Sequence, residues 1–121
     1  DEWLFAANGG KNFKNFIFSG SDTLDKVGWY LENSRKGDIP EPNKVGILQA
    51  NTVGLYDMSG NLWEWCEEWD NQEENLKIVA GGAFNMDANS CTVNSFDNAD
   101  AYTPKRNDYN TIGVRLCRNF K

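Results

Sequence analysis

Residues 54–66 read Gly54-Leu55-Tyr56-Asp57-Met58-Ser59-Gly60-Asn61-Leu62-Trp63-Glu64-Trp65-Cys66, a mixture of glycine, aromatic and acidic residues that ordinary core does not explain. Within this stretch, two carboxylates stand at Asp57 and Glu64, and two backbone carbonyls lie between them at Gly60 and Leu62. Calcium takes about six to eight oxygen ligands, and a glycine turn can direct carbonyl groups toward an ion that carboxylates neutralise. The stretch therefore predicts a calcium site formed by Asp57, Gly60, Leu62 and Glu64. The alternative is that both carboxylates only brace the turn through backbone N–H groups.

Length and charge restrict the classes of partner. The chain has 121 residues, which fits one domain spanning 1–121, since a chain of this size buries roughly two thirds of its unfolded surface. Its 18 acidic and 12 basic residues give a net charge of −6, which repels phosphate backbones and anionic lipid. We therefore expect neither nucleic acid nor membrane as a partner. No apolar run approaches the roughly 20 residues that span a bilayer, and Asp1-Glu2 does not open a signal peptide.

The cysteine and histidine counts restrict metal chemistry. The chain contains Cys66, Cys91 and Cys117 but no histidine. The cysteines do not have the paired spacing of zinc sites, so zinc and iron are not expected. One disulfide with a free thiol and three reduced thiols both agree with this count.

Three further blocks accompany residues 54–66 along the chain: Asp1-Glu2-Trp3-Leu4-Phe5-Ala6-Ala7-Asn8-Gly9-Gly10 before it, and Ala80-Gly81-Gly82-Ala83-Phe84 and Ile112-Gly113-Val114-Arg115-Leu116 after it. Together the four blocks resemble the formylglycine-generating-enzyme (sulfatase-modifying factor) type of C-type-lectin-like domain. The resemblance implies an α+β, C-type-lectin-like fold in which a small twisted antiparallel sheet and a short helix support long irregular loops. It also implies calcium at Asp57, Gly60, Leu62 and Glu64, and a chain that begins where the family's sequences are already under way.

Local patterns predict few regular elements. Residues 1–7 have the pattern of a helix that Asn8-Gly9-Gly10 ends, because a left-handed glycine is a common helix stop. Short strands are predicted at 13–18, 62–66, 77–80 and 111–117. The other residues are predicted to be irregular, since Gly and Asn interrupt them every few positions.

The family's oxidases hold copper with a cysteine pair that follows a Gly-Gly-Ser segment, and thiolates suit this soft ion. After Gly81-Gly82, the present chain has Cys91 at the second cysteine position but Met86 at the first. A thioether cannot be deprotonated, so we expect neither copper binding nor catalysis. Cys91 is instead predicted to be a small buried hydrophobe. A formylglycine-generating-type oxidase, degenerate because its cysteine pair is broken, is the alternative function.

Residues 85–110 differ in composition from the rest of the chain. They include six Asn, four Asp, two Ser, two Thr and two Tyr, and lack Gly, Leu, Ile, Trp, Gln and Glu. The apolar residues Met86, Val93 and Phe96 are widely spaced, which predicts an irregular loop that they anchor. Asn, Ser, Asp and Tyr are also favoured in binding loops, because they combine adaptable hydrogen bonds with rigid contact area.

This segment, closed by residues 112–116, resembles the variable region of diversity-generating-retroelement variable proteins, in which adenine-directed mutagenesis rewrites a display surface. The resemblance implies a variable segment at about 83–110 and a ligand-binding, hypervariable surface, formed by Asn85, Asp87, Asn89, Ser90, Asn94, Asp97, Asn98, Asp100, Tyr102, Asn107, Asp108, Tyr109 and Asn110. The expected scaffold positions are Ala80, Gly81, Gly82, Cys91, Arg106, Gly113, Arg115 and Leu116. The implied partner is a protein or glycan on another cell or virus, and the implied location is a virion or cell surface.

Two alternatives to variable display stay open. The Asn-rich segment can belong to a lectin-like domain with a purely structural loop. The tripeptide Glu41-Pro42-Asn43 matches a sugar-binding signature of lectins, although the resemblance explains it better as part of the segment before residues 54–57.

Overall fold

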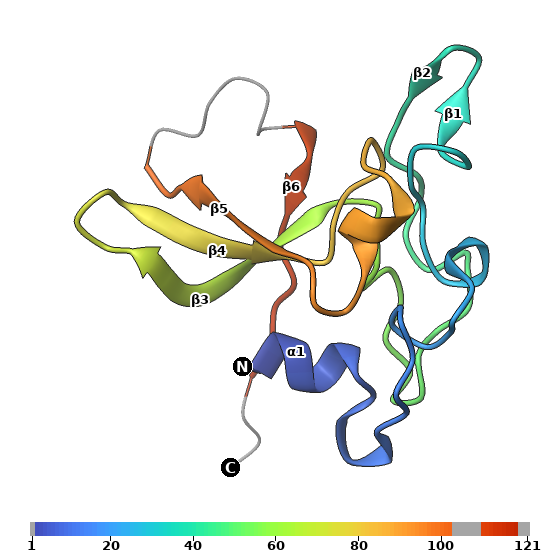
Figure 1. The fold of residues 1–121 in the computed structure, drawn as a ribbon, viewed down its shortest axis with the longest axis horizontal. Coiled ribbons are helices and arrows are strands. Elements are labelled where there is room, and N and C mark those ends of the chain that lie inside the picture. The colour runs from blue at the N-terminus through green and yellow to red at the C-terminus, as the bar shows by residue number, and fades with distance from the viewer. Residues whose placement is uncertain (1, 103–109, 119–121) are drawn as a thin grey trace.

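The computed structural model describes residues 2–102 and 110–118. The order of elements is α1 (Glu2–Ala7), η1 (Gly10–Asn12), η2 (Leu24–Lys26), β1 (Arg35–Lys36), β2 (Ile39–Pro40), β3 (Trp63–Asn71), β4 (Leu76–Ala80), η3 (Ala88–Cys91), β5 (Phe96–Asp100) and β6 (Ile112–Gly113). Figure 1 shows a twisted sheet on one side, long loops with the β1–β2 hairpin on the other, and α1 beside the sheet. The predicted α+β class is confirmed. Among the described residues, no helix is both long and apolar enough to cross a bilayer.

The main sheet has the strand order β5-β4-β3-β6. β4 pairs antiparallel with β3 and with β5, whereas β6 pairs parallel with β3. The sheet is therefore antiparallel, as predicted, except for the short parallel pairing of β6 with β3. A parallel neighbour cannot be joined by a tight hairpin, and β4 and β5 lie between β3 and β6 in the sequence. Register shifts in the β3–β4 ladder lie between Trp65 and Trp69 and between Trp69 and Asn71, and such irregularities increase local twist.

The predicted helix is confirmed over the described residues 2–7. Asn8 closes it by donating from Nδ2 to the carbonyl oxygen of Leu4 at 2.9 Å. Gly9 follows with φ of 90°, and its N–H donates to the carbonyl of Ala6. The Asn-Gly signal therefore predicted the helix end for the right physical reason, because a left-handed residue suits glycine.

The strand predictions were only partly right. The strands predicted at 62–66 and 77–80 correspond to β3 and β4, which are longer. The prediction at 13–18 is wrong, since Phe18 forms only an isolated bridge with Ser21. The prediction at 111–117 is too long, because pairing stops at Gly113 and the next residues Val114 and Leu116 are exposed. The fully irregular segment predicted at 85–110 is also wrong, since it contains η3 and β5.

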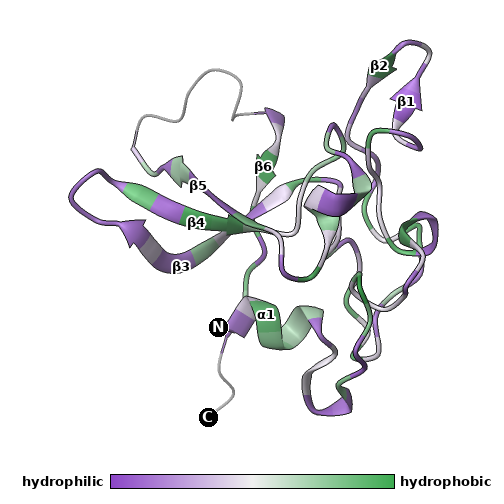
Figure 2. Cartoon of the chain, in the orientation of Figure 1, coloured by the Kyte–Doolittle hydropathy of each residue, from purple (hydrophilic) through white to green (hydrophobic). Residues whose placement is uncertain are grey.

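Three apolar clusters form the core. One lies among the loops around Phe18, Leu24, Val27, Tyr30 and Cys91. A second lies at the sheet and contains Trp63, Val79, Ala83 and Ala99. The third joins α1 to the loops through Ala7, Met58 and Val93. Met86 is half-buried and packs against the first two clusters, so this position joins the loops to the sheet. Figure 2 shows hydrophobic residues at the base of β4 and hydrophilic residues at the β3–β4 turn.

Candidate functional site

The predicted display positions lie mainly on the outside of the molecule. We call the ten that the structure describes the polar face: Asn85, Asp87, Asn89, Ser90, Asn94, Asp97, Asn98, Asp100, Tyr102 and Asn110. All are exposed except Ser90 and Asp100, which are half-buried. Asn107, Asp108 and Tyr109 lie outside the described residues. The described residues of the polar face are therefore at the surface and do not form part of the core.

Small buried residues hold the polar face in place. Ala80, Gly81, Gly82 and Cys91 are all buried, as expected for scaffold positions. Gly82 has φ of 79°, and a Cβ there would overlap the carbonyl oxygen of Ser90. The chain can therefore pass this close to η3 only with glycine, because any other residue would be both strained and blocked.

Of three further apolar residues in the segment that carries the polar face, two are buried and one is exposed. Val93 is 5% exposed, and its N–H donates to the carbonyl of Ile17 at 3.0 Å. Ala99 is the buried residue of β5 and packs in the sheet cluster. Phe96 was expected to anchor the segment but is 45% exposed, and its ring lies edge-on to Trp3. Among the remaining scaffold positions, Gly113 and Arg115 are half-buried, Leu116 is exposed, and Arg106 lies outside the described residues.

Some side chains of the polar face shape the backbone. Asp87 Oδ1 accepts hydrogen bonds from the backbone N–H and the hydroxyl of Ser90, both at 2.9 Å, and so caps η3. Asn98 Nδ2 donates to Asp70 Oδ2 at 2.9 Å, which links β5 to β3. Asp100 Oδ1 accepts from the backbone N–H of Tyr102. In contrast, the side chains of Asn85, Asn89 and Asn94 have no hydrogen-bond partner within residues 2–102 and 110–118. The face thus contains both positions that support the fold and positions open to replacement.

The predicted calcium ligands lie at a turn beside a cavity of about 360 Å³, which Asp57, Leu62, Glu64 and Arg115 help to line. Asp57 is buried with φ of 59°, and its Oδ2 accepts from the Gly46 N–H at 2.7 Å. Its other oxygen, Oδ1, is buried with no hydrogen-bond partner in the part of the chain that is described. A buried carboxylate oxygen without a donor is costly, so Asp57 fits a cation.

Glu64 has different surroundings. Arg115 donates from Nε to Glu64 Oε2 at 2.8 Å and from a terminal nitrogen to Oε1 at 2.6 Å, and Trp3 Nε1 also donates to Oε2 at 2.8 Å. Arg115 reaches further to the Tyr56 carbonyl at 2.8 Å. Burial alone lowers the pKa of Arg115, but the hydrogen bonds and charge of Glu64 and the charge of Asp57 raise it above its usual value. Glu64 is thus satisfied by protein donors and ties α1, β3 and the C-terminal segment together.

This role of Glu64 was not predicted. Arg115 is 51 residues away in the sequence, and its position in the Ile-Gly-Val-Arg-Leu block indicated only a scaffold residue. Within the described ranges, no group of three or more His, Cys, Asp or Glu side chains is placed to hold a metal ion. Of the two carboxylates predicted to bind calcium, Asp57 has one buried oxygen without a hydrogen-bond donor among the described groups, whereas both oxygens of Glu64 accept hydrogen bonds.

The three cysteines are free thiols that differ in burial. Cys91 is completely buried in the loop cluster, and burial raises the pKa of its thiol to about 12. Cys66 is half-buried, with a pKa raised first by burial and then by Glu68, and Cys117 is exposed. Cys66 and Cys117 line one cavity of about 260 Å³ beside Trp3 and Met58, away from Cys91. The predicted burial of Cys91 is confirmed, and burial disfavours the thiolate that copper chemistry needs.

The lectin-type tripeptide is engaged within the fold. Glu41 forms an ion pair with Lys36 at 3.2 Å, and both side chains are about half exposed. Asn43 exchanges backbone-to-side-chain hydrogen bonds with Asn61, at 2.9 and 3.2 Å. The tripeptide thereby fastens the loop after β2 to the turn that contains Asn61.

Comparison with known proteins identifies the family. Residues 1–120 match the family described as the sulfatase-modifying factor enzyme 1-like domain. The chain belongs to this family. The Chaperone protein LppX of Paenibacillus barcinonensis is 35% identical, over 93% of this chain and 43% of the relative. The Inactive C-alpha-formylglycine-generating enzyme 2 of Bos taurus is 25% identical, over 69% of this chain and 30% of the relative. The chain therefore spans less than half the length of these curated relatives.

A solved structure supports the same assignment. Treponema denticola variable protein 1 superposes with a TM-score of 0.77 and 25% identity, over 93% of this chain and 43% of that chain. The predicted C-type-lectin-like fold of this superfamily is confirmed, and a variable protein of a diversity-generating retroelement is among its structural neighbours.

Proposed function

We propose that this chain is a non-catalytic ligand-binding domain of the diversity-generating-retroelement variable type, which binds a protein or glycan through the polar face. The observation that carries the proposal is the outward direction of that face on a frame of buried small residues. Eight of its ten positions are exposed, whereas Ala80, Gly81, Gly82 and Cys91 are buried beneath them. Side chains on such a surface can change while the core stays the same.

The names of the relatives support a binding role. One relative is a chaperone, which is a protein that acts on other proteins, and another is an inactive form of an enzyme of this family. Both names agree with a member of this family that binds without catalysis. Fold alone does not fix function, so the proposal depends on the polar face and on the state of Cys91.

The alternative function is a formylglycine-generating-type oxidase, because the family description names an enzyme. Its chemistry would need two thiolates at one place. Here Met86 occupies the first position of the pair, and Cys91 is buried with a pKa of about 12. Titration of the full chain with copper(I) under a competing chelator separates the two functions. Weak or absent binding agrees with the binding domain, and a tight complex with sulfur ligation to Cys91 would overturn it.

The decisive test of variability is the DNA around the coding sequence. We expect a near-copy of the codons for residues 83–110, which differs from the gene at adenines and lies beside a reverse transcriptase gene. Independent isolates should then differ at the polar face and not at Gly81, Gly82 or Cys91. If no such repeat exists, or if isolates vary equally at buried and exposed positions, the display proposal is wrong and the segment is a structural loop.

We also propose that a calcium ion braces the turn at Asp57. The buried oxygen Oδ1 of Asp57 lacks a hydrogen donor among the described groups, and calcium would satisfy it. The carbonyls of Gly60 and Leu62 would complete the protein share of the site. Glu64 would enter the site only by exchanging its hydrogen bonds with Arg115. When bound, the ion would supply structural bracing and no reaction chemistry.

A further inference from the structure

An aromatic hollow lies at the end of the sheet beside the polar face. Its volume is about 260 Å³, and it is lined by Trp65, Trp69, Lys77, Ala101 and Tyr102. The rings of Trp69 and Tyr102 lie with centroids 6.4 Å apart and planes tilted by 35°. Both tryptophans are half-buried, whereas Tyr102 is 71% exposed. The hollow therefore has fixed aromatic walls on β3 and one ring that belongs to the polar face.

One cation already uses an aromatic wall of the hollow. The ammonium group of Lys77 lies 4.9 Å from the centroid of the Trp69 ring and donates to the Glu67 carbonyl at 2.8 Å. An indole ring attracts a cation at this distance through its quadrupole. The fold thus shows that this ring accepts an ammonium group, which an arginine or lysine from outside can also offer.

The stretch of sequence that carries the hollow is strongly acidic. Residues 61–102 contain nine Asp or Glu but a single basic residue, Lys77, so this stretch has a net charge of −8. The whole chain has only −6, and the remaining residues are therefore slightly basic. Extension of the stretch to residue 109 adds two basic residues and one acidic residue, which leaves −7.

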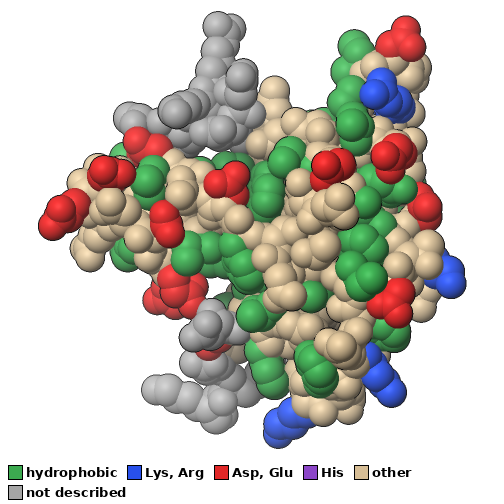
Figure 3. All heavy atoms as spheres, in the orientation of Figure 1, with side chains coloured by type: hydrophobic (Ala, Val, Ile, Leu, Met, Phe, Trp, Pro, Cys, Tyr) green, Lys and Arg blue, Asp and Glu red, His purple; other side chains and the backbone are tan. Residues whose placement is uncertain are grey.

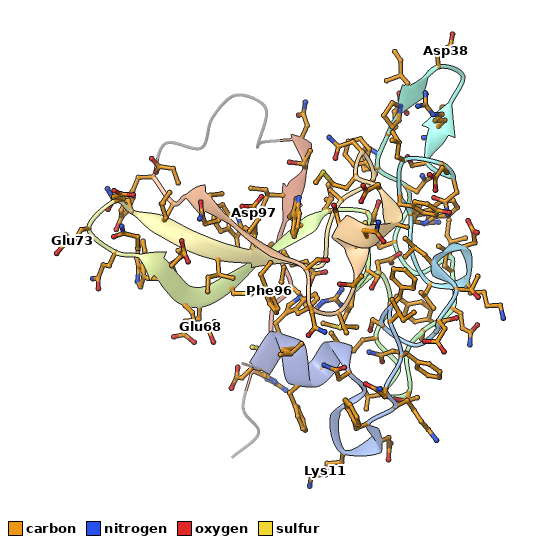
Figure 4. The ribbon with its side chains drawn as sticks, viewed as in Figure 1. Lys11, Asp38, Glu68, Glu73, Phe96 and Asp97 are labelled. Carbon is orange, nitrogen blue, oxygen red and sulfur yellow. The ribbon has the colours of Figure 1, made fainter. Side chains whose placement is uncertain are left out.

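The pictures place this charge on the sheet. Figure 3 shows acidic side chains over the end of the sheet that includes the β3–β4 turn, whereas the visible Lys and Arg side chains lie elsewhere. In Figure 4, Glu68 lies on β3, Glu73 points away from the β3–β4 turn, and Asp97 lies on β5. Such a field concentrates positively charged partners and repels negatively charged ones.

We propose that the aromatic hollow binds a lysine or arginine side chain from a basic segment of a protein partner. This inference rests on the proposed function and specifies its partner class. The guest cation replaces the Lys77 ammonium on Trp69, and the surrounding carboxylates hold the rest of the basic segment. Tyr102 is a display position, so one wall of the hollow can change between variants while Trp65 and Trp69 stay constant. Constant rings would then supply affinity and the polar face would supply selectivity.

The test measures binding of three fluorescent probes to the full chain: the peptide (Gly-Arg)5, the peptide (Gly-Glu)5 and a neutral cello-oligosaccharide. We expect only (Gly-Arg)5 to bind, and about tenfold more weakly at high than at low salt. Trp69→Ala and Tyr102→Ala should each weaken it by about tenfold. Tyr102→Ala is the safer variant for folding, because its side chain is mostly exposed. Lys77→Met should strengthen binding by about threefold, because it removes a competing cation.

Matched controls separate the hollow from general attraction. Phe13→Ala removes an exposed aromatic residue in the loop after η1, and Asp38→Asn removes a carboxylate at the β1–β2 hairpin, away from the sheet end (Figure 4). Neither should change binding by more than about twofold. The inference is overturned if Tyr102→Ala behaves like Phe13→Ala, if Lys77→Met weakens binding, or if the oligosaccharide binds independently of salt. The binding experiments and the search for the DNA repeat test different proposals. If the hollow binds no basic peptide, the variable display function can still hold. If the DNA repeat is absent but the peptide binds, the hollow is a basic-peptide site with a fixed sequence.

Discussion

Asp57 and Asp97 have the same side chain but opposite surroundings. Asp57 is 8% exposed, has positive φ and directs one oxygen to Gly46. Asp97 is exposed on β5, and among the described residues its side chain accepts only the N–H of Asn98. Asp57 belongs to the buried frame, where its Oδ2 has a protein partner and its Oδ1 has none among the described groups, and Asp97 belongs to the polar face. The same carboxylate side chain therefore supports the fold at position 57 and can be replaced at position 97. The reason is that a polar group without a partner destabilises the folded state when it is buried and not when it is exposed.

The sharpest test of the frame is Gly60→Ala. Gly60 has φ of 73°, and an added Cβ would overlap the Trp29 carbonyl. Backbone strain and a blocked backbone contact together should cost more than about 3 kcal/mol of unfolding free energy. Gly46→Ala is the matched control, because Gly46 has φ of 72° but nothing within 4 Å of the added Cβ. It should cost only about 1 kcal/mol in urea titrations. Equal losses in the two variants would show that packing around Gly60 is looser than described.

A second test removes the hydrogen bonds between Glu64 and Arg115. Arg115→Met leaves Glu64 with a buried charge and only the Trp3 donor, so we expect a loss of about 3 kcal/mol in unfolding free energy. Lys36→Met is the control, because the Lys36–Glu41 pair is 60% and 49% exposed at its side chains. Exposed pairs contribute little, and this variant should stay within about 0.5 kcal/mol of the parent in the same denaturation experiment. If Arg115→Met costs as little as Lys36→Met, the buried ion pair contributes no more to stability than the exposed one, and the contrast between the buried frame and the polar face is wrong.

A third test concerns calcium. Calcium should raise the thermal midpoint of unfolding. At calcium concentrations of about ten to one hundred times the dissociation constant, the stabilisation should be about 1 to 3 kcal/mol. Asp57→Asn should abolish this response, whereas Asp97→Asn on β5 should leave it intact. Differential scanning fluorimetry with calcium and with a chelator measures both. A response that survives Asp57→Asn would place the ion elsewhere and contradict the proposed site.

The smallest effects are expected on the polar face. Asn85→Ala, Asn89→Ala and Asn94→Ala should each stay within about 0.5 kcal/mol, because their side chains have no partner among the described residues. Asp87→Ala should cost about 1 kcal/mol, since Asp87 caps η3. Thermal melts of the four variants check this order. If any of the three asparagine variants loses more unfolding free energy than Asp87→Ala, the polar face contributes to the stability of the fold and its residues are not freely replaceable.

Several elements could be predicted from the sequence because their signals are local. The helix end at Asn8-Gly9 depends on one side-chain bond and one left-handed residue, and both are encoded next to the helix. β5 could not be predicted, since it is an edge strand in which only Ala99 is buried. The strand predicted at 13–18 failed for the opposite reason: its aromatic residues suit a strand, but none of the described strands pairs with them.

The candidate site divides in the same way. The outward polar face could be predicted from composition, because Asn and Asp without apolar spacing cannot form a core. The pairing of Glu64 with Arg115 could not, because the two residues are 51 positions apart and each alone also fits a surface charge. The aromatic hollow was missed as well, since Trp69 and Tyr102 meet only after β3, β4 and β5 pair.

The sequence by itself determined the family, the broken cysteine pair and the excess negative charge of residues 61–102. These properties depend on residue type and spacing, which are complete before the chain folds. Only the tertiary structure decided which carboxylate is satisfied, which thiol is buried and where aromatic rings meet the polar face. Each of these depends on contacts between distant residues, and burial then sets whether a given charge is costly, paired or free to meet a partner.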